Sequence, residues 1–425
     1  MDLTRRSLLA GAAKLTAGAA AASALAACGS SSSGGSGSGS GSGTTTLTLW
    51  YDHPEWQTQF NKLVSQFEKE NPGISIQASP KPGAPYNTII ASALATGSAP
   101  DIFKIDAGAG FVAAVNGGHF HDLTGKLNNI GNYNDGALAV SQVDGKLYGI
   151  SILGQYNIGV YYWLDEFAKY NLHPPTTWDE WTAVCSTLKK NGVVPFLNPA
   201  SDGILTTFLW TTLLTTVQGP DAIPKIESGA LKITEPSFLA ATEFYKSMEP
   251  YFNPGYLSIG INTGDSLFAY KKAAMICGGS ADYAGFQSTN PGVTGNLGYF
   301  AVPGPTGSKP AVTIGVDGLF GINKATTDPA KVEAGNKFLN WWLSKPVGAE
   351  VSNTIELSCI KDASTTNPMY QKIIAQSSVN GPTWFEPVPL TPLWTYSTEE
   401  IAKLFTGALS PAAFTQAAQS HIKTS

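Results

Sequence analysis

The sequence predicts an α/β protein with parallel sheets, divided into two domains or lobes. Short β-prone runs alternate with amphipathic stretches of helical length, which is the order of βαβ units. The chain has 425 residues, more than a single hydrophobic core normally serves. Its 43% hydrophobic and 13% charged residues exclude a disordered chain.

The first elements of the body are the clearest. Residues 47–51 form an apolar, β-prone run, and a helical stripe follows with apolar residues at i, i+4, i+7, i+8 and i+11: Trp56, Phe60, Leu63, Val64 and Phe67. Asn71-Pro72-Gly73 ends this helix, and a second strand opens at Ile74. A helix at 86–96 and a strand at 102–105 continue the alternation.

Later elements follow the same signals. Strands are predicted at 145–152, 159–164, 273–277 and 319–322, and helices at 329–343 and 411–422. Thr177 and Glu180 have capping-box spacing at the start of another helix. One face of that helix is apolar and carries Trp178, Trp181, Val184, Cys185 and Leu188.

The first 46 residues resemble an export and anchoring segment. Arg5-Arg6 precede a run of small and apolar residues that ends in Leu25-Ala26-Ala27-Cys28, which resembles a bacterial lipoprotein signal of the twin-arginine type. Residues 1–27 are then the signal peptide and Cys28 the lipidated residue. Residues 28–46 are almost entirely Gly, Ser and Thr and predict a flexible tether. A membrane-spanning helix is the alternative, but the run is weakly apolar for a stable span.

Charge and cysteine content exclude several classes of protein. Without residues 1–27 the chain has 23 basic and 30 acidic residues, a net charge of −7, and no Lys/Arg cluster. This balance argues against nucleic-acid binding. The absence of a CxxC motif excludes zinc ribbons and thioredoxin-type redox sites. Cys185 is expected as a core thiol, and Cys277–Cys359 is the candidate disulfide.

No catalytic constellation can be assembled from the motifs. His119-x-His121 lacks a third metal ligand, and residues 278–281 lack the last glycine of a nucleophile elbow. The glycine pattern at 108–113 follows the third predicted strand instead of the first, so a dinucleotide site is not expected. We therefore expect no metal, no cofactor and no enzymatic activity. A facing pair of carboxylates, as in glycosidases, cannot be dismissed from sequence.

Aromatic residues are abundant near predicted strand ends. They make up 11% of the chain, and sugar rings pack on such flat faces while their hydroxyls bond Asp, Asn and Gln. Tryptophans on helical stripes, such as Trp178 and Trp341, are expected in the core. For Tyr51, Tyr162 and Trp384, core and ligand-binding interpretations are equally open. The aromatic residues concerned are Tyr51, Trp56, Tyr156, Tyr161, Tyr162, Trp163, Tyr283, Trp384 and Trp394.

Five segments, in order, carry a family resemblance. They are 47–51 with 67–74, then 93–102 (ALATGSAPDI), 144–150 (DGKLYGI), 175–180 (PTTWDE) and 272–275 (KAAM). With them the chain resembles extracellular solute-binding lipoproteins of ABC importers, in the carbohydrate-binding family 1. The similarity spans residues 47–343 and the C-terminal helix.

The resemblance implies a two-lobed, maltose-binding-protein-like fold whose lobes are mostly parallel sheets flanked by helices. Lobe 1 is expected at 47–153 and 315–360, and lobe 2 at 154–314 and 361–425. A monomeric receptor would bind a sugar or oligosaccharide in the interlobe cleft, close around it, and deliver it to an ABC permease at the extracytoplasmic face of the membrane.

The resemblance also implies the positions of ligand contacts. Aromatic faces would stack on the sugar, while Asp52, Asp106 and Asp317 accept its hydroxyl protons. Two departures leave the sugar open: Trp163 stands where the family has Asn, and the tryptophan usual after the 273–275 strand is missing. The predicted ligand-binding residues are Tyr51, Asp52, His53, Trp56, Asp106, Gln155, Tyr156, Tyr162, Trp163, Ser280, Asp282, Tyr283, Asp317 and Trp384. Alternatives are a non-sugar solute (polyamine, iron complex or phosphonate), a surface glycoside hydrolase or a structural lipoprotein.

Overall fold

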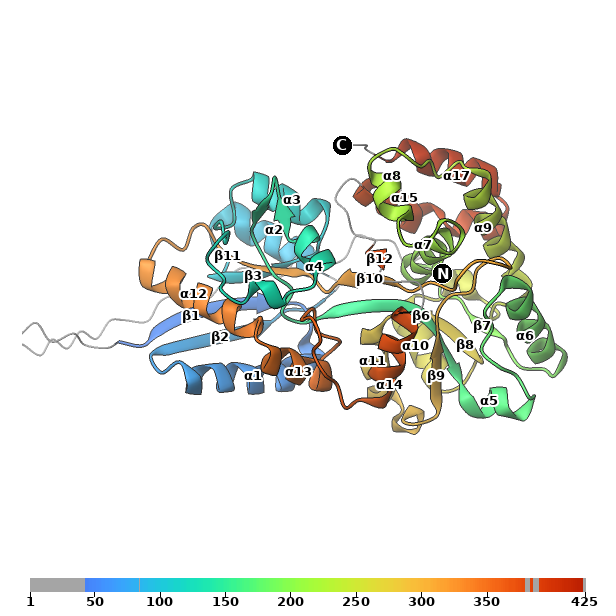
Figure 1. Cartoon of the computed structure of the whole chain (residues 1–425), viewed down its shortest axis with the longest axis horizontal. Coiled ribbons are helices and arrows are strands. Elements are labelled where there is room, and N and C mark those ends of the chain that lie inside the picture. The colour runs from blue at the N-terminus through green and yellow to red at the C-terminus, as the bar shows by residue number, and fades with distance from the viewer. Residues whose placement is uncertain (1–42, 84, 379–382, 385–389, 423–425) are drawn as a thin grey trace, which may run out of the picture. The chain divides into compact units, whose positions relative to one another are not determined.

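A computed structural model describes residues 43–422, except 84, 379–382 and 385–389 (Figure 1). The predicted signal peptide, Cys28 and most of the predicted tether lie outside the described residues. The predicted α/β class is confirmed, because the described chain forms two main sheets flanked by helices. Below, lobe 1 and lobe 2 denote the two sets of residues predicted above.

The lobe 1 sheet has the order β11-β3-β1-β2. Strands β1 (Thr45–Tyr51), β2 (Ile74–Pro80) and β3 (Ile102–Ile105) are parallel, with Thr45 opposite Ile74 and Leu49 opposite Ile102. Strand β11 (Leu319–Ile322) is antiparallel to β3. Helices α1 (Gln57–Glu70) and α12 (Pro329–Trp342) cover one face, and α2 (Tyr86–Thr96) and α3 (Ala109–Asn116) the other (Figure 1).

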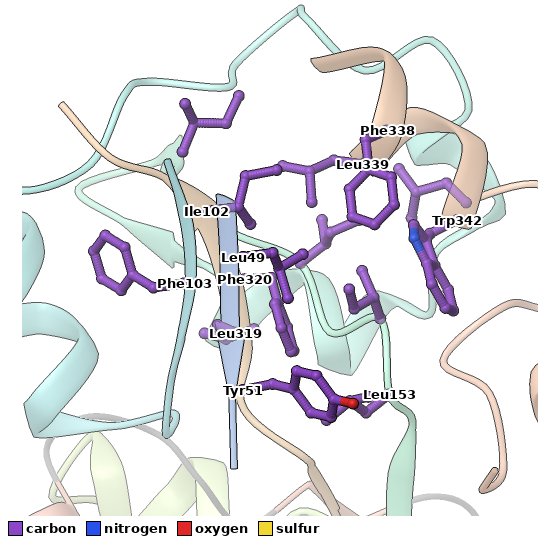
Figure 2. Close-up of a cluster of buried hydrophobic side chains, with 14 of the residues drawn as sticks. Leu49, Tyr51, Ile102, Phe103, Leu153, Leu319, Phe320, Phe338, Leu339 and Trp342 are labelled. Atoms are coloured by element: carbon purple, nitrogen blue, oxygen red, sulfur yellow. The ribbon is translucent and has the colours of Figure 1, made fainter. Parts of the chain in front are cut away.

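The core of lobe 1 is aromatic where β1 meets α1 and α12. Figure 2 shows Tyr51 among these buried side chains, next to Leu153. Its ring stacks on Phe60 at 4.6 Å, and Phe60 stacks on Trp342 at 5.4 Å. Smaller elements complete the lobe: α4 (Asp135–Val140), β4 (Gln142–Val143), β5 (Lys146–Leu147) and α13 (Lys345–Thr354).

The lobe 2 sheet has the order β12-β10-β6-β8-β7, with β9 also paired to β6. The long strand β6 (Gln155–Trp163) is antiparallel to β10 (Thr313–Val316), β8 (Met275–Gly278) and β9 (Leu297–Phe300). The short β7 (Phe196–Leu197) and β12 (Thr383–Trp384) are parallel to β8 and β10. All the strands other than β6 therefore run in one direction.

Helices of lobe 2 begin where the sequence carries start signals. The predicted capping box is confirmed at α6 (Trp178–Lys190), where the Thr177 side chain accepts from the Glu180 amide. Helix α7 (Ile204–Gln218) is buried nearly all round. The other helices are α5 (Leu164–Lys169), α8 (Ala222–Glu227), α9 (Pro236–Ser247), α10 (Ile261–Ala269), α11 (Ser280–Thr289), α14 (Pro368–Ser377), α15 (Thr391–Glu400), α16 (Ala402–Thr406) and α17 (Pro411–Ser420).

Three crossover segments connect the two lobes. They lie before β6, between β10 and β11, and between α13 and α14, and they contact one another. The amide of Gln155 donates to the carbonyl of Leu357 at 2.7 Å, and the amide of Asp317 donates to the carbonyl of Gly154 at 3.0 Å. The crossovers therefore form one hydrogen-bonded bundle.

Two expectations are wrong. The strand predicted at 145–152 shrinks to β5 and an isolated bridge at Ile150. Asp144 and Gly145 take left-handed conformations (φ 50° and 72°), so the chain turns there and β5 pairs back on β4 in a short hairpin instead of extending the main sheet. The predicted Cys277–Cys359 disulfide is absent. Neither residue forms a disulfide, and both are buried, Cys277 in a lobe 2 core and Cys359 in the lobe 1 core. The core position of Cys185 is confirmed.

Candidate functional site

A charged cluster lies where β1 and β3 end, at the edge where a parallel sheet places its ligands. The Lys104 ammonium is 2.7 Å from Asp52, 3.0 Å from Asp106 and 3.4 Å from Asp317. Asp52 follows β1, Asp106 follows β3, and Asp317 lies in the crossover between β10 and β11. The cluster therefore joins lobe 1 to a crossover.

His53 adds a second cation. Its Nε2 lies 3.1 Å from an oxygen of Asp317 and its Nδ1 lies 2.7 Å from Glu55, while its ring stacks on Trp56 at 4.1 Å. Burial by itself lowers the pKa of His53, but the charge of Asp317 and the hydrogen bonds outweigh it and raise the pKa to about 10. His53 is therefore charged at neutral pH.

The carboxylates of the cluster differ in exposure. The side chain of Lys104 is 3% exposed and that of Asp317 is 14% exposed, whereas that of Asp106 is 54% exposed. Burial raises the pKa of Asp106, but the ammonium of Lys104 and the amide of Asn87, which donates at 3.0 Å, bring it below its usual value. Asp106 is thus a fixed, ionised acceptor that a ligand can reach.

Asp52 and Asp317 respond differently to the same neighbours. Burial raises the pKa of Asp52 above its usual value, although the charge of Lys104 opposes the increase. For Asp317, the charges of His53 and Lys104 overcome the effect of burial and lower the pKa. Asp317 therefore stays ionised beside the two cations.

A pocket of about 640 Å³ opens beside Asp106. Most of its wall comes from α2 and α3 of lobe 1, and Trp394 on α15 of lobe 2 lines it as well. The lining residues are Asn87, Ile90, Ala91, Leu94, Ala95, Ile105, Asp106, Ala107, Gly110, Ala113, Ala114, His119 and Trp394. The pocket thus receives side chains from both lobes.

An aromatic row runs from the first crossover to this pocket. Tyr156 on β6 lies 5.4 Å from Phe208 on α7, and Phe208 lies 4.8 Å from Trp394, measured between ring centroids. All three rings are partly buried against the lobe 2 core. A row of this kind can pack against the apolar faces of sugar rings.

The crossover bundle carries a polar network next to the charged cluster. The Ser280 hydroxyl lies 2.9 Å from the carbonyl of Gln155 and 3.0 Å from Oε1 of Glu356, and it accepts from the Asn157 amide at 3.1 Å. Glu356 is fully buried, and its Oε2 has no hydrogen-bond partner among the described residues. The network links lobe 2 to two crossovers.

The comparisons with known proteins identify the family of the chain. A sequence profile of the family described as bacterial extracellular solute-binding protein matches residues 50–349, or 300 of the 425 residues. The chain belongs to this family. In Streptococcus mutans, the Multiple sugar-binding protein is 25% identical to this solute-binding protein over 281 residues, which cover 62% of this chain and 63% of the relative.

Solved structures share the fold. A chitin oligosaccharide binding protein has a TM-score of 0.75 and 22% identity, over 89% of this chain and 98% of its own. A structure from work on xylan utilization by the thermophilic bacterium Caldanaerobius polysaccharolyticus has a TM-score of 0.75 and 25% identity, over 89% of this chain and 100% of its own. The predicted two-lobed binding-protein fold is thereby confirmed. The chain covers 47% to 63% of the length of the first curated relatives.

The structure of this solute-binding protein brings some predicted site residues together. Asp52, His53, Trp56, Asp106 and Asp317 form or adjoin the charged cluster. Tyr156 belongs to the aromatic row, and Gln155 and Ser280 belong to the crossover network, where Gln155 also accepts from Asn134 at 3.0 Å. Their contact with a ligand stays a prediction.

Other predicted site residues lie within the cores. Tyr51 and Trp163 are 0% and 3% exposed, and the Trp163 indole donates to the carbonyl of Phe268. Tyr162 packs on Phe167 at 4.4 Å, and Tyr283 packs against Tyr370 at 6.1 Å.

Two predicted residues have other positions. Asp282 accepts from the Gly279 amide at the start of α11. Trp384 belongs to β12, and its side chain lies outside what the structure describes. A ligand contact by any of these six residues stays a prediction.

Sequence reasoning missed Lys104, Asn87, Phe208 and Glu356 as site residues. A lysine in an otherwise apolar strand, between Phe103 and Ile105, was a usable signal, because a buried lysine needs a carboxylate partner. The others carried no sequence signal, since their neighbours are distant in the chain.

Neither of the two histidines of the His119-x-His121 pair takes part in a metal site. The Nε2 of His121 lies 2.9 Å from the carbonyl of Thr326, and His119 lines the pocket. Between residues 43 and 422, outside the gaps, no group of three or more His, Cys, Asp or Glu side chains is arranged to hold a metal ion. In the same range, no helix is long and apolar enough to cross a membrane.

Proposed function

We propose that this solute-binding protein binds a sugar or oligosaccharide and delivers it to an ABC permease, without chemistry on the ligand. The observation that carries the proposal is the juxtaposition of the half-exposed Asp106 carboxylate with a pocket that the aromatic row reaches. A carboxylate accepts hydroxyl protons and aromatic faces pack on sugar C–H groups. The names of the relatives support the ligand class.

In the proposed mechanism, ligand contacts on both lobes favour a closed arrangement over an open one. Lys104 and Asn87 hold Asp106 in place, so the carboxylate needs little reorganisation when a hydroxyl arrives. The crossover bundle is the part that would bend. Asp317 takes part in both the bundle and the charged cluster, so it would sense ligand and hinge together.

The proposal also covers the location of the protein and its attachment to the membrane. The twin-arginine signal, a diacylglycerol on Cys28 and the Gly/Ser tether would keep a monomeric receptor at the extracytoplasmic face of the membrane. Two acyl chains give stable anchoring, whereas one gives only marginal binding.

A polyamine is the second candidate ligand. Asp202, Asp265 and Asp282 lie close enough in lobe 2 for their charges to interact, and cationic amines pair with such groups. Burial, followed by the charges of Asp282 and Asp202, raises the pKa of Asp265 to about 9, so this carboxyl is neutral at pH 7. A bound ammonium would lower this pKa again, so the pKa does not decide between the two ligands. We rank the sugar first because of the aromatic row and the pocket beside Asp106.

Calorimetry on the purified chain tests the proposed site. Asp106→Asn removes an ionised acceptor, and hydrogen bonds to charged groups contribute ~1.5–3 kcal/mol, so sugar affinity should fall roughly 10- to 100-fold. Asp221→Asn is the control, because that residue is exposed, precedes α8 and does not line the pocket. Equal affinities for wild type and Asp106→Asn would remove Asp106 from the site.

A further inference from the structure

The pocket beside Asp106 is polar at its ends and apolar between them. Asn87 and Asp106 provide polar atoms at the N-terminal ends of α2 and α3, and His119 provides them beyond the end of α3. Between these ends the lining from lobe 1 is aliphatic or glycine: Ile90, Ala91, Leu94, Ala95, Ile105, Ala107, Gly110, Ala113 and Ala114. We call this stretch the α2/α3 groove.

The groove is open because its exposed side chains are small. Ala91 and Ala95 on α2 face the pocket together with Gly110 and Ala113 on α3, and all four are exposed. Larger residues at these positions would fill the space as in an ordinary helix–helix contact, since protein interiors are close-packed. A contiguous apolar surface of this kind marks a binding region.

The length and chemistry of the groove restrict what can occupy it. Asn87 and Leu94 are seven residues apart on one helix, a separation of about 10 Å at 1.5 Å per residue. No polar side chain among the lining residues lies along this stretch. Sugar hydroxyls placed there would lose their hydrogen bonds to water without replacement, which is unfavourable. The groove therefore suits an apolar group.

Two contacts tie the groove to the ligand site. Asp106 lies at one end of the groove and also belongs to the charged cluster, so a sugar ring held by Asp106 has the groove as its neighbour. Trp394 lines the same pocket from lobe 2 and is the last ring of the aromatic row. An apolar group in the groove can thus contact both lobes.

We propose that the ligand is a glycoside that carries an apolar substituent, such as an aryl aglycone or an acyl group, and that the α2/α3 groove binds this substituent. The inference rests on the proposed sugar-binding function and narrows its ligand class. The sugar ring lies at Asp106, and the substituent lies along Ala91, Leu94 and Ala113 under Trp394. Bare sugars then bind through only part of the site.

Paired glycosides test the proposal on the full chain. Methyl and phenyl β-glycosides of glucose, N-acetylglucosamine, xylose and galactose are titrated by calorimetry, together with short oligosaccharides of the same sugars. A phenyl ring that buries its apolar area in the groove should bind roughly ten-fold or more tightly than methyl on the same sugar. Equal affinities for the methyl and phenyl members overturn the inference.

A filled-groove variant locates the effect. In Ala91→Leu/Ala113→Leu the phenyl advantage should shrink to about two-fold or less, because the new side chains occupy the groove. The matched control is Ser92→Leu/Asn116→Leu, which adds the same side chains at exposed positions that do not line the pocket. The groove assignment is overturned if the filled-groove variant keeps the affinity advantage of the phenyl glycoside over the methyl glycoside. It is also overturned if the control variant loses that advantage.

Failure of the inference and failure of the proposed function give different results. If sugars or oligosaccharides bind but the phenyl group adds nothing, the receptor function stands and the groove assignment is wrong. If no sugar, oligosaccharide or glycoside binds, the proposed function fails and the inference fails with it.

Discussion

Replacing Glu356 by glutamine is expected to remove a pH dependence that this buried carboxyl group gives to stability. A single hydroxyl proton on Ser280 cannot serve both nearby acceptors, the carbonyl of Gln155 and Oε1 of Glu356. If Glu356 carries a proton, it donates to Ser280, and Ser280 donates to Gln155 while accepting from the Asn157 amide. The Ser280 hydroxyl is then satisfied as donor and as acceptor, so the network favours a neutral Glu356.

The groups around Glu356 agree with a neutral side chain. Burial raises the pKa of Glu356 well above its usual value, and the negative charge of Asp317 on the second crossover adds to the increase. The hydrogen bond that Ser280 would donate to an ionised Glu356 and the charge of His53 oppose the increase, while Asp282 on α11 raises the pKa further. On α14, burial raises the pKa of Tyr370, which is therefore neutral in the same range.

The sign and size of the effect follow from linkage. Below the pKa of the unfolded chain, about 4.3, both states hold the proton and the stabilisation is fully present. As pH rises above that value, the unfolded chain releases the proton and the folded chain keeps it. The free energy of unfolding then falls by about 1.4 kcal/mol per pH unit until the folded pKa is passed. Between pH 5 and pH 7 the loss is about 2.7 kcal/mol if the folded pKa lies above 7.

Urea unfolding of wild type and Glu356→Gln across pH 4.5–8 measures this loss. Glutamine keeps a donor for Ser280 but cannot ionise. As pH rises, the free energy of unfolding of the variant should therefore increase relative to that of wild type by about 1.4 kcal/mol per pH unit. Glu350→Gln, at an exposed position on α13, should follow the wild-type profile. Parallel profiles for wild type and Glu356→Gln would refute the hydrogen-bond argument.

Three further substitutions test the fold around the site by urea unfolding. Lys104→Met removes the cation that three carboxylates share and leaves Asp52 and Asp317 with His53 alone, so it should lower stability by about 3 kcal/mol or more. Lys337→Met, in an exposed pair, should cost less than about 1 kcal/mol, and equal costs would contradict the buried cluster. Gly318→Ala places a Cβ 2.1 Å from the Lys104 side chain at φ +67°. It should therefore lower stability more than Gly97→Ala, where φ is +70° but the space around the Cβ is open. Equal losses would mean that the backbone angle alone matters. Thr177→Ala removes the capping box of α6 and should cost about 1 kcal/mol, and no loss would show that the cap is dispensable.

Local signals in the sequence predict much of lobe 1. The helix at Tyr86–Thr96 and the strand at Ile102–Ile105 have the predicted bounds, because their apolar patterns end at Gly97 and before Asp106. Lobe 2 is harder to predict. Its short strand β7 has only two residues, and α7 is buried nearly all round, so it lacks the polar face that marks an amphipathic helix.

The site likewise contains residues that the sequence could predict and residues that it could not. Asp52 and Asp106 follow predicted strands, and their position at the sheet edge could be expected from the order of elements. Asp317 follows β10, a strand that was not predicted, and only the family resemblance pointed to it. The role of Lys104 depends on a crossover more than 200 residues away, and the network of Glu356 joins segments 76 and more residues apart. Pairings at such separations are set by tertiary structure, which spacing along the chain does not encode.

Thermal unfolding of the purified chain against a panel of mono- and oligosaccharides, with spermidine and ferric citrate included, tests the central claim most directly. A ligand at 100 times its dissociation constant adds ~2.7 kcal/mol, which moves the midpoint by several degrees. We predict a rise with one sugar series and no rise with spermidine or ferric citrate. A rise with spermidine or ferric citrate and none with any sugar would contradict the proposed ligand class while leaving the solute-binding fold in place.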